Sequence, residues 1–80
     1  MKIIKITHVI PESGYKLHVA FDNGNAGLFD VTPYLECNAF MPLKQHAEFK
    51  RIRNGGYFVE WDCGADLSAD TLAAHIIKTN

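Results

Sequence analysis

Four carboxylates lie close together near the end of the sequence: Glu60, Asp62, Asp66 and Asp70. Carboxylate oxygens that converge on one point can hold a hard divalent cation. The four-residue spacing of the last three would align them only on a continuous helix, and Gly64 and the N-cap residue Ser68 interrupt any such helix. We therefore predict that Asp66 is a loop or cap residue, that Asp70 complements the helix dipole, and that the chain has no metal site.

Cys63 lies among these carboxylates and is the stronger of two candidate nucleophiles, Cys37 being the other. It would need an imidazole, from His75 or His18, to become a thiolate, and the neighbouring negative charges disfavour that anion. No H-x-x-x-H spacing of a zinc site relates the four histidines: His8, His18, His46 and His75. The sequence also lacks G-x-G-x-x-G, P-loop, G-x-S-x-G and H-E-x-x-H motifs. We predict no catalytic residue, no cofactor and no enzymatic activity.

One short segment carries half of the eight Lys and Arg residues: Lys44, Lys50, Arg51 and Arg53. Such a patch can contact phosphates, and Tyr57 or Phe58 could stack on bases. The competing interpretation is a solvated face balanced by Glu48 and by a cross-strand pair between Lys50 and Glu60. The net charge of −1 favours this second interpretation, because nucleic-acid-binding domains usually carry a strong positive charge. Nucleic-acid binding through residues 44–53 is therefore the alternative function.

The composition fits one soluble globular domain over residues 1–80, with 48% hydrophobic and 21% charged residues. The first residues have neither the apolar run nor the small-residue cleavage site of a signal peptide. No apolar run approaches the roughly 18 residues that a membrane span requires. Two distant cysteines suggest no disulfide framework. We expect a cytoplasmic protein with reduced thiols and no membrane partner.

The clearest structural pattern is an alternation over residues 15–21, which predicts a strand buried on one side. Its apolar residues are Tyr15, Leu17, Val19 and Phe21. The turn at residues 11–14 predicts a hairpin with these opposed pairs: Ile10 and Tyr15, His8 and Leu17, Ile6 and Val19, Ile4 and Phe21. A three-residue loop with Asn25 in the left-handed conformation then pairs Val19 with Phe29, and Leu17 with Val31.

Short helices are expected at residues 32–36, with Thr32 as N-cap and Pro33 as first helical position, and at residues 45–50, where Phe49 points inward. A second hairpin reverses at residues 54–56 and places Tyr57, Val59 and Trp61 on one face. Residues 62–67 are expected to form a loop. A final helix capped by Ser68 runs to Lys78 and carries one apolar stripe: Ala69, Leu72, Ala73, Ile76 and Ile77.

The fold class predicted from these elements is α+β, with one antiparallel sheet of about four or five strands covered on one face by the helices. The other face is expected to be only partly polar and is the candidate protein interface. Its residues are Lys16, His18, Ala20 and Leu28. Apolar surface left on a small sheet often marks a protein contact.

The sequence also resembles the small bacterial family catalogued as domain of unknown function 2442. The residues that carry the resemblance are Tyr15, Leu17, Val19, Phe21, Gly24, Leu43, Phe49, the segment 61–68 and Leu72. The resemblance implies a compact α+β domain and transfers no activity. It also suggests a binding partner, because family members are often encoded beside another small protein in arrangements that look like toxin–antitoxin pairs. The sequence departs from the family pattern at Asp62 and Cys63, where Pro-Asn is expected, which leaves the shape of this loop open.

We therefore expect a non-catalytic protein-interaction module, antitoxin-like or an adaptor. Its expected partner is another small protein or a second copy of itself.

Overall fold

The alternating strands assemble into two antiparallel sheets in the computed structural model, which describes residues 4–78. The first sheet has the order β1-β2-β3-β7, and β7 contributes only two residues at its edge. The bounds are Ile6–Glu12 for β1, Lys16–Phe21 for β2, Ala26–Asp30 for β3 and Ile77–Lys78 for β7. The second sheet contains β4 (Ile52–Asn54), β5 (Phe58–Trp61) and β6 (Asp66–Ser68). The α+β class is confirmed, whereas the expectation of one sheet was wrong.

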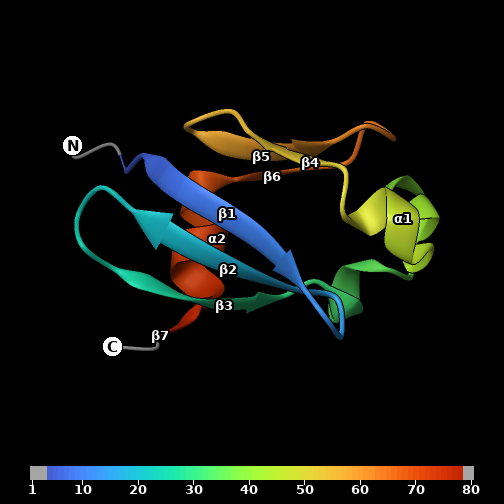
Figure 1. Cartoon of the computed structure of the whole chain (residues 1–80), viewed down its shortest axis with the longest axis horizontal. Helices are drawn as coiled ribbons and strands as arrows, with labels where there is room; N and C mark the ends of the chain where they lie inside the picture. The colour runs from blue at the N-terminus through green and yellow to red at the C-terminus, as the bar shows by residue number, and fades with distance from the viewer. Residues whose placement is uncertain (1–3, 79–80) are drawn as a thin grey trace.

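Helix α2 (Ala69–His75) lies behind the first sheet in Figure 1, and a group of short helices closes one end of the molecule. These are the 3₁₀ helices η1 (Thr32–Tyr34) and η2 (Asn38–Lys44), followed by α1 (His46–Phe49). Thr32 was expected to be the N-cap of η1, but the N-cap is Val31. The expected inward position of Phe49 is confirmed, since it is buried with Leu43. In the part of the chain described here, no helix has the length and apolar character needed to cross a bilayer.

Hydrogen bonds at the start of β1 join the two sheets. The Ile6 amide donates to the Gly56 carbonyl at 2.6 Å, and the Asn54 side chain donates to the Ile6 carbonyl at 2.9 Å. Beyond this point the strands diverge toward α1 (Figure 1). Asn54 also accepts a hydrogen bond from the Gly56 amide at 2.8 Å, so one side chain shapes the second hairpin and ties it to β1.

The first hairpin turns at residues 13–15 rather than at the expected residues 11–14, so its expected register was wrong: Ile10 lies opposite His18 rather than Tyr15. A bulge then shifts the register again near the start of β1. Ile6 lies opposite Phe21, but the register shifts before His8, and Val9 then faces Val19. One extra residue turns every later side chain to the other face. Ile6 is therefore buried, while His8 and Ile10, both expected on the apolar side, point outward and are exposed.

The second reversal has a three-residue loop, as expected, but it lies one residue earlier in the sequence. The Phe21 amide donates to the Asn25 carbonyl and the Gly24 amide to the Phe21 carbonyl, and Gly24 takes a φ of +89°. The left-handed residue is thus Gly24, which adopts this conformation at less cost than Asn25. Leu17 consequently faces Phe29 rather than Val31.

The segment after Trp61 repeats this loop geometry, so the expected loop at 62–67 was wrong in its second half. The Trp61 amide donates to the Ala65 carbonyl and the Gly64 amide to the Trp61 carbonyl, with a Gly64 φ of +98°. Both loops have the sequence aromatic-Asp-x-Gly. The chain therefore returns as β6, whose Leu67 faces Val59.

The final helix begins as predicted and ends earlier. The Ser68 hydroxyl accepts a hydrogen bond from the Thr71 amide at 3.1 Å, which confirms the N-cap. The helix ends at His75, and Ile76 is already extended. Ile77 then pairs with Leu28 in β7 and is exposed, so its expected place on the apolar stripe was wrong. Two successive β-branched residues favour the extended chain, and the edge of β3 supplies backbone partners.

The core combines side chains from both sheets, α2 and the middle segment. Trp61 is fully buried, and its indole nitrogen donates to the Phe49 carbonyl at 2.9 Å. The buried side chains of β2 are Leu17, Val19 and Phe21, as the alternation predicted. Tyr15 instead lies in the turn before β2, half-buried, with a φ of +60°.

The link between the sheets yields a first prediction. Asn54→Ala removes the hydrogen bond to Ile6 and the bond from Gly56, and should lower the free energy of unfolding by about 1–2 kcal/mol. Urea unfolding can be followed by the fluorescence of Trp61, the only tryptophan. Asn38→Ala, at an exposed position in η2, is the matched control and should change stability by less than about 0.5 kcal/mol. Equal losses in the two variants would contradict the role of Asn54.

A second prediction concerns Asp30, whose carboxylate accepts a hydrogen bond from the Thr32 amide at 2.9 Å. Hydrogen bonds from Thr32, and to a smaller extent the charge of Lys16, lower the pKa of Asp30 below its usual value. A lowered pKa stabilises the folded protein above about pH 4, and this stabilisation is lost as the pH falls through the folded-state pKa.

Asp30→Ala should therefore destabilise the protein at pH 7 by less than about 1 kcal/mol, because solvent screens an exposed carboxylate. The difference from wild type should shrink as the pH falls below about 4. Urea unfolding at several pH values measures it. Asp66→Ala removes an exposed carboxylate from β6 and serves as the control. A wild-type advantage that persisted unchanged at low pH would rule out the charged form of Asp30 as its source.

Candidate interaction surface

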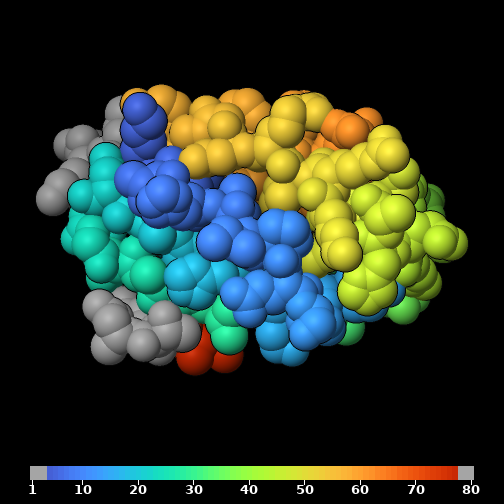
Figure 2. All heavy atoms as spheres, viewed as in Figure 1, coloured from blue at the N-terminus to red at the C-terminus, as the bar shows by residue number. Residues whose placement is uncertain are grey.

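The face of the first sheet opposite α2 carries a mostly apolar row of side chains across all four strands. The register makes its members successive cross-strand neighbours: Ile10, His18, Leu28 and Ile77. Ile10 is 53% exposed and Ile77 is 73% exposed, at the two edges of the sheet. Figure 2 shows the molecule from this side, with atoms of β1 and β2 in front. We call this face the outer face.

Two further rows flank the apolar row on the outer face. On one side lie His8, Ala20 and Ala26, and on the other lie Glu12, Lys16 and Asp30. The members of the charged row are all exposed, and Ala20 and Ala26 are half-buried. The outer face therefore has a charged end, an apolar middle and an end of mainly small side chains.

The four residues predicted as a protein interface all lie on this face: Lys16, His18, Ala20 and Leu28. The sequence reasoning missed Ile10 and Ile77, the two most exposed apolar members of the row. Ile10 was missed because the turn was expected at residues 11–14, which paired Ile10 with Tyr15 instead of His18. Ile77 could have been found, because two adjacent β-branched residues, Ile76 and Ile77, favour a strand over a helix.

The basic segment does not form an uncompensated positive patch. Arg53 lies between Glu60 and Asp62 and bonds to both carboxylates, which raise its pKa. Arg51 lies 3.9 Å from Asp62. Lys44 pairs with Glu36, with 3.9 Å between its Nζ atom and a carboxylate oxygen.

Lys50 differs from the other three basic residues, since no carboxylate of residues 4–78 lies within ion-pair distance of it. The expected Lys50–Glu60 pair was wrong, because the register places Arg53 opposite Glu60.

The two aromatic residues proposed for base stacking are accessible to different degrees. Tyr57 is 55% exposed and lies just before β5, so it does not share the buried face of Val59 and Trp61 as predicted. Phe58 is 42% exposed. Its ring covers the backbone of Gly55, where a Cβ atom would approach the ring to 2.4 Å. One side of Phe58 is therefore already occupied.

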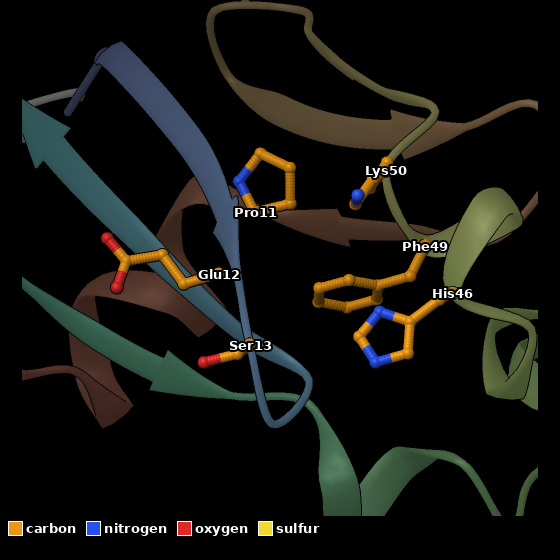
Figure 3. Close-up of a pocket in the computed structure, with 6 residues that line it drawn as sticks. All are labelled: Pro11, Glu12, Ser13, His46, Phe49 and Lys50. Atoms are coloured by element: carbon orange, nitrogen blue, oxygen red, sulfur yellow. The ribbon is translucent and has the colours of Figure 1, made fainter.

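A cleft of about 230 Å³ separates the tip of the first hairpin from α1, lined by Pro11, Glu12, Ser13, His46, Phe49 and Lys50. Figure 3 shows the side chains of Glu12 and Ser13 directed away from His46 and Phe49. The His46 ring stacks on Tyr15 with 5.3 Å between centroids. The polar side chains therefore do not converge on one point, as a small-molecule site requires.

A second hollow, of about 330 Å³, is lined by Phe29, Asp30, Pro33, Tyr34 and His75. Its carboxylate, from Asp30, already accepts the capping hydrogen bond from Thr32. Apolar and aromatic groups form most of the remaining wall.

The candidate nucleophile and the carboxylates near it are dispersed. Cys63 is exposed and unbridged in the loop between β5 and β6, whereas His18 lies on the other sheet. Asp62 is held by the two arginines, and Asp66 and Asp70 are exposed on β6 and α2. Within residues 4–78 no three His, Cys, Asp or Glu side chains gather as metal ligands would.

The chain was compared with protein families, curated proteins and solved structures. The family described as Protein of unknown function (DUF2442) matches residues 6–78. Neither a curated protein nor a solved structure gives a significant match. The family match covers nearly the whole sequence, including both hairpins and α2. The chain therefore belongs to this family of proteins of unknown function.

Proposed function

We propose that this protein is a non-catalytic protein-interaction module that binds its partner through the outer face. The observation that carries the proposal is the apolar row with Ile10 and Ile77 exposed at its two ends. Covering these side chains removes apolar surface from water, at about 25 cal/mol for each Å². An apolar row that crosses a small sheet from one edge to the other is typical of a contact surface.

The position of the ionic groups supports the outer face over the basic segment. A phosphate backbone would have to compete with Glu60 and Asp62 for Arg53, and with Asp62 for Arg51. Displacing those carboxylates leaves them unpaired beside a polyanion, which is unfavourable. Nucleic-acid binding through residues 44–53 with Tyr57 remains the alternative, and Lys50 is its best-placed cation.

We propose more finely that the module is antitoxin-like or an adaptor. An antitoxin-like or adaptor role beside another small bacterial protein agrees with a domain that has a contact face and dispersed polar groups. We propose a cytoplasmic location for this role, where the exposed cysteines Cys37 and Cys63 would stay reduced.

A third prediction tests the contact face. Ile10→Lys places a charge in the apolar row at an exposed position, so it should leave the fold intact and abolish partner binding. Tagged wild-type and variant proteins would be expressed in the native host, cross-linked in cells and purified. Quantitative mass spectrometry should show a partner, another protein or a second copy, whose recovery falls at least about tenfold in Ile10→Lys.

Met41→Lys is the matched control, because Met41 is 45% exposed but lies in η2. It should retain the partner, and cross-links should map to residues of the outer face. A partner retained equally by Ile10→Lys and Met41→Lys would overturn the proposal, as would the recovery of none with the wild type.

A fourth prediction separates the alternative function. Fluorescence anisotropy with single-stranded and double-stranded oligonucleotides at about 20 mM salt should show no binding, since most of the basic segment is charge-compensated. Salt-sensitive binding that is abolished by Lys50→Glu with Arg53→Glu would replace the protein-interaction proposal by the nucleic-acid one. Lys16→Glu, on the outer face, controls for the general loss of positive charge.

A further inference from the structure

We propose that the outer face binds a second copy of this chain, sheet against sheet, in a two-fold symmetric dimer. This inference rests on the proposed function, because it names the partner of the same surface. Closed two-fold dimers are the commonest soluble homo-oligomers, and each one requires a surface that is complementary to itself. The three rows of the outer face meet that requirement in charge and in side-chain size.

The symmetry axis runs along the apolar row, across the strands. A rotation about this axis places the apolar row on itself, so that Ile10, Leu28 and Ile77 each cover their own equivalents. Facing sheets lie about 10 Å apart, a distance that side chains of this length fill by interdigitation. His18, between Ile10 and Leu28 in the row, lies near the axis and faces its equivalent.

Charge complementarity follows from the same rotation. The charged row (Glu12, Lys16 and Asp30) and the row of His8, Ala20 and Ala26 lie two residues from the apolar row, on opposite sides of it. The rotation therefore brings each of these two rows opposite the other one of the second copy. In β1 this places Glu12 opposite His8 of the second copy, and the symmetry forms the contact twice. Both residues are exposed in the single chain and accessible to a second copy.

Side-chain size is complementary in the same way on the other two strands. Lys16 in β2 faces Ala20 of the second copy, and Asp30 in β3 faces Ala26. A long or charged side chain thus lies over a short one, which leaves it room to reach water at the rim. Glu12, Lys16 and Asp30 therefore face no group of their own charge.

An axis parallel to the strands satisfies the surface less well. It would bring Lys16 opposite Asp30, but these two are already cross-strand neighbours within one chain and gain little from a second contact. It would also place Glu12 beyond the end of β7, which has only two residues. The axis along the apolar row is therefore the one we propose.

A fifth prediction measures the dimer directly. Sedimentation velocity and light scattering of the untagged wild type, from about 5 to 200 µM, should show the mass rising from 9.0 kDa toward twice that value. Ile10→Lys should remain at 9.0 kDa throughout, because symmetry buries the new charge twice. Met41→Lys should dimerise as the wild type does. Circular dichroism and urea unfolding establish that all variants are folded.

The pairing of Glu12 with His8 can be tested by a charge exchange. Glu12→Lys should raise the dissociation constant about tenfold, and adding His8→Glu in the same chain should restore it to within about threefold of wild type. The rescue tests the proposed axis, because the side chains at positions 12 and 8 meet only between two copies related by that axis.

A wild-type mass of 9.0 kDa at every concentration overturns the dimer, and so does a dimer that Ile10→Lys leaves intact. An intact dimer without rescue by the double variant overturns the proposed axis. If the wild type is monomeric but a different protein is recovered in an Ile10-dependent way, the proposed function stands and this inference alone fails. If neither is found, both fail.

Discussion

The buried indole of Trp61 is the interaction on which the arrangement of the two sheets depends. Its nitrogen donates to the Phe49 carbonyl, and its ring packs against Phe40 and Phe49, each with 6.1 Å between centroids. Phe40 contacts Tyr34, which in turn contacts Phe29 on the first sheet. Trp61 thereby holds the irregular middle segment between the sheets. Because the hydrogen bond satisfies the only polar atom of a fully buried ring, the tryptophan can be central without an unpaired donor.

The bulge in β1 connects this core to the contact surface. Before the bulge, Ile6 faces inward, and both its backbone groups bond to the second hairpin. After the bulge the parity reverses, so Val9 faces inward and Ile10 faces solvent. The turn at residues 13–15 pairs Ile10 with His18 and so places a large apolar side chain on the outer face, while the bulge turns Ile6 inward beside the second hairpin. A regular strand continued from this turn would keep Ile10 outside and would turn Ile6 outward as well.

Sequence reasoning succeeded here where one local pattern decides the structure. The alternation over Leu17, Val19 and Phe21 places these residues in the core, and the Ser68 hydroxyl caps α2 as its type suggests. It failed where two distant segments decide. The inward position of Ile6 follows from a bulge at the point where its amide bonds to Gly56, which lies far away in the sequence. The end of α2 depends on the free edge of β3. The strand β6 was different, because the loop sequence aromatic-Asp-x-Gly occurs twice and could have indicated a second hairpin of the same kind.

The available surfaces differ in what binding would cost, and this difference favours the outer face. On the second sheet, Arg53 is already paired with the carboxylates of Glu60 and Asp62. Covering these three charged groups with a partner would remove water from them, which is unfavourable. On the outer face, the exposed groups at the centre are mainly hydrocarbon, whose burial is favourable, while the charged row lies to one side where it can keep its water. The patch predicted from sequence, Lys16, His18, Ala20 and Leu28, lies on this same face. The apolar row at its centre became visible only once the register brought Ile10 and Ile77 into line with His18 and Leu28.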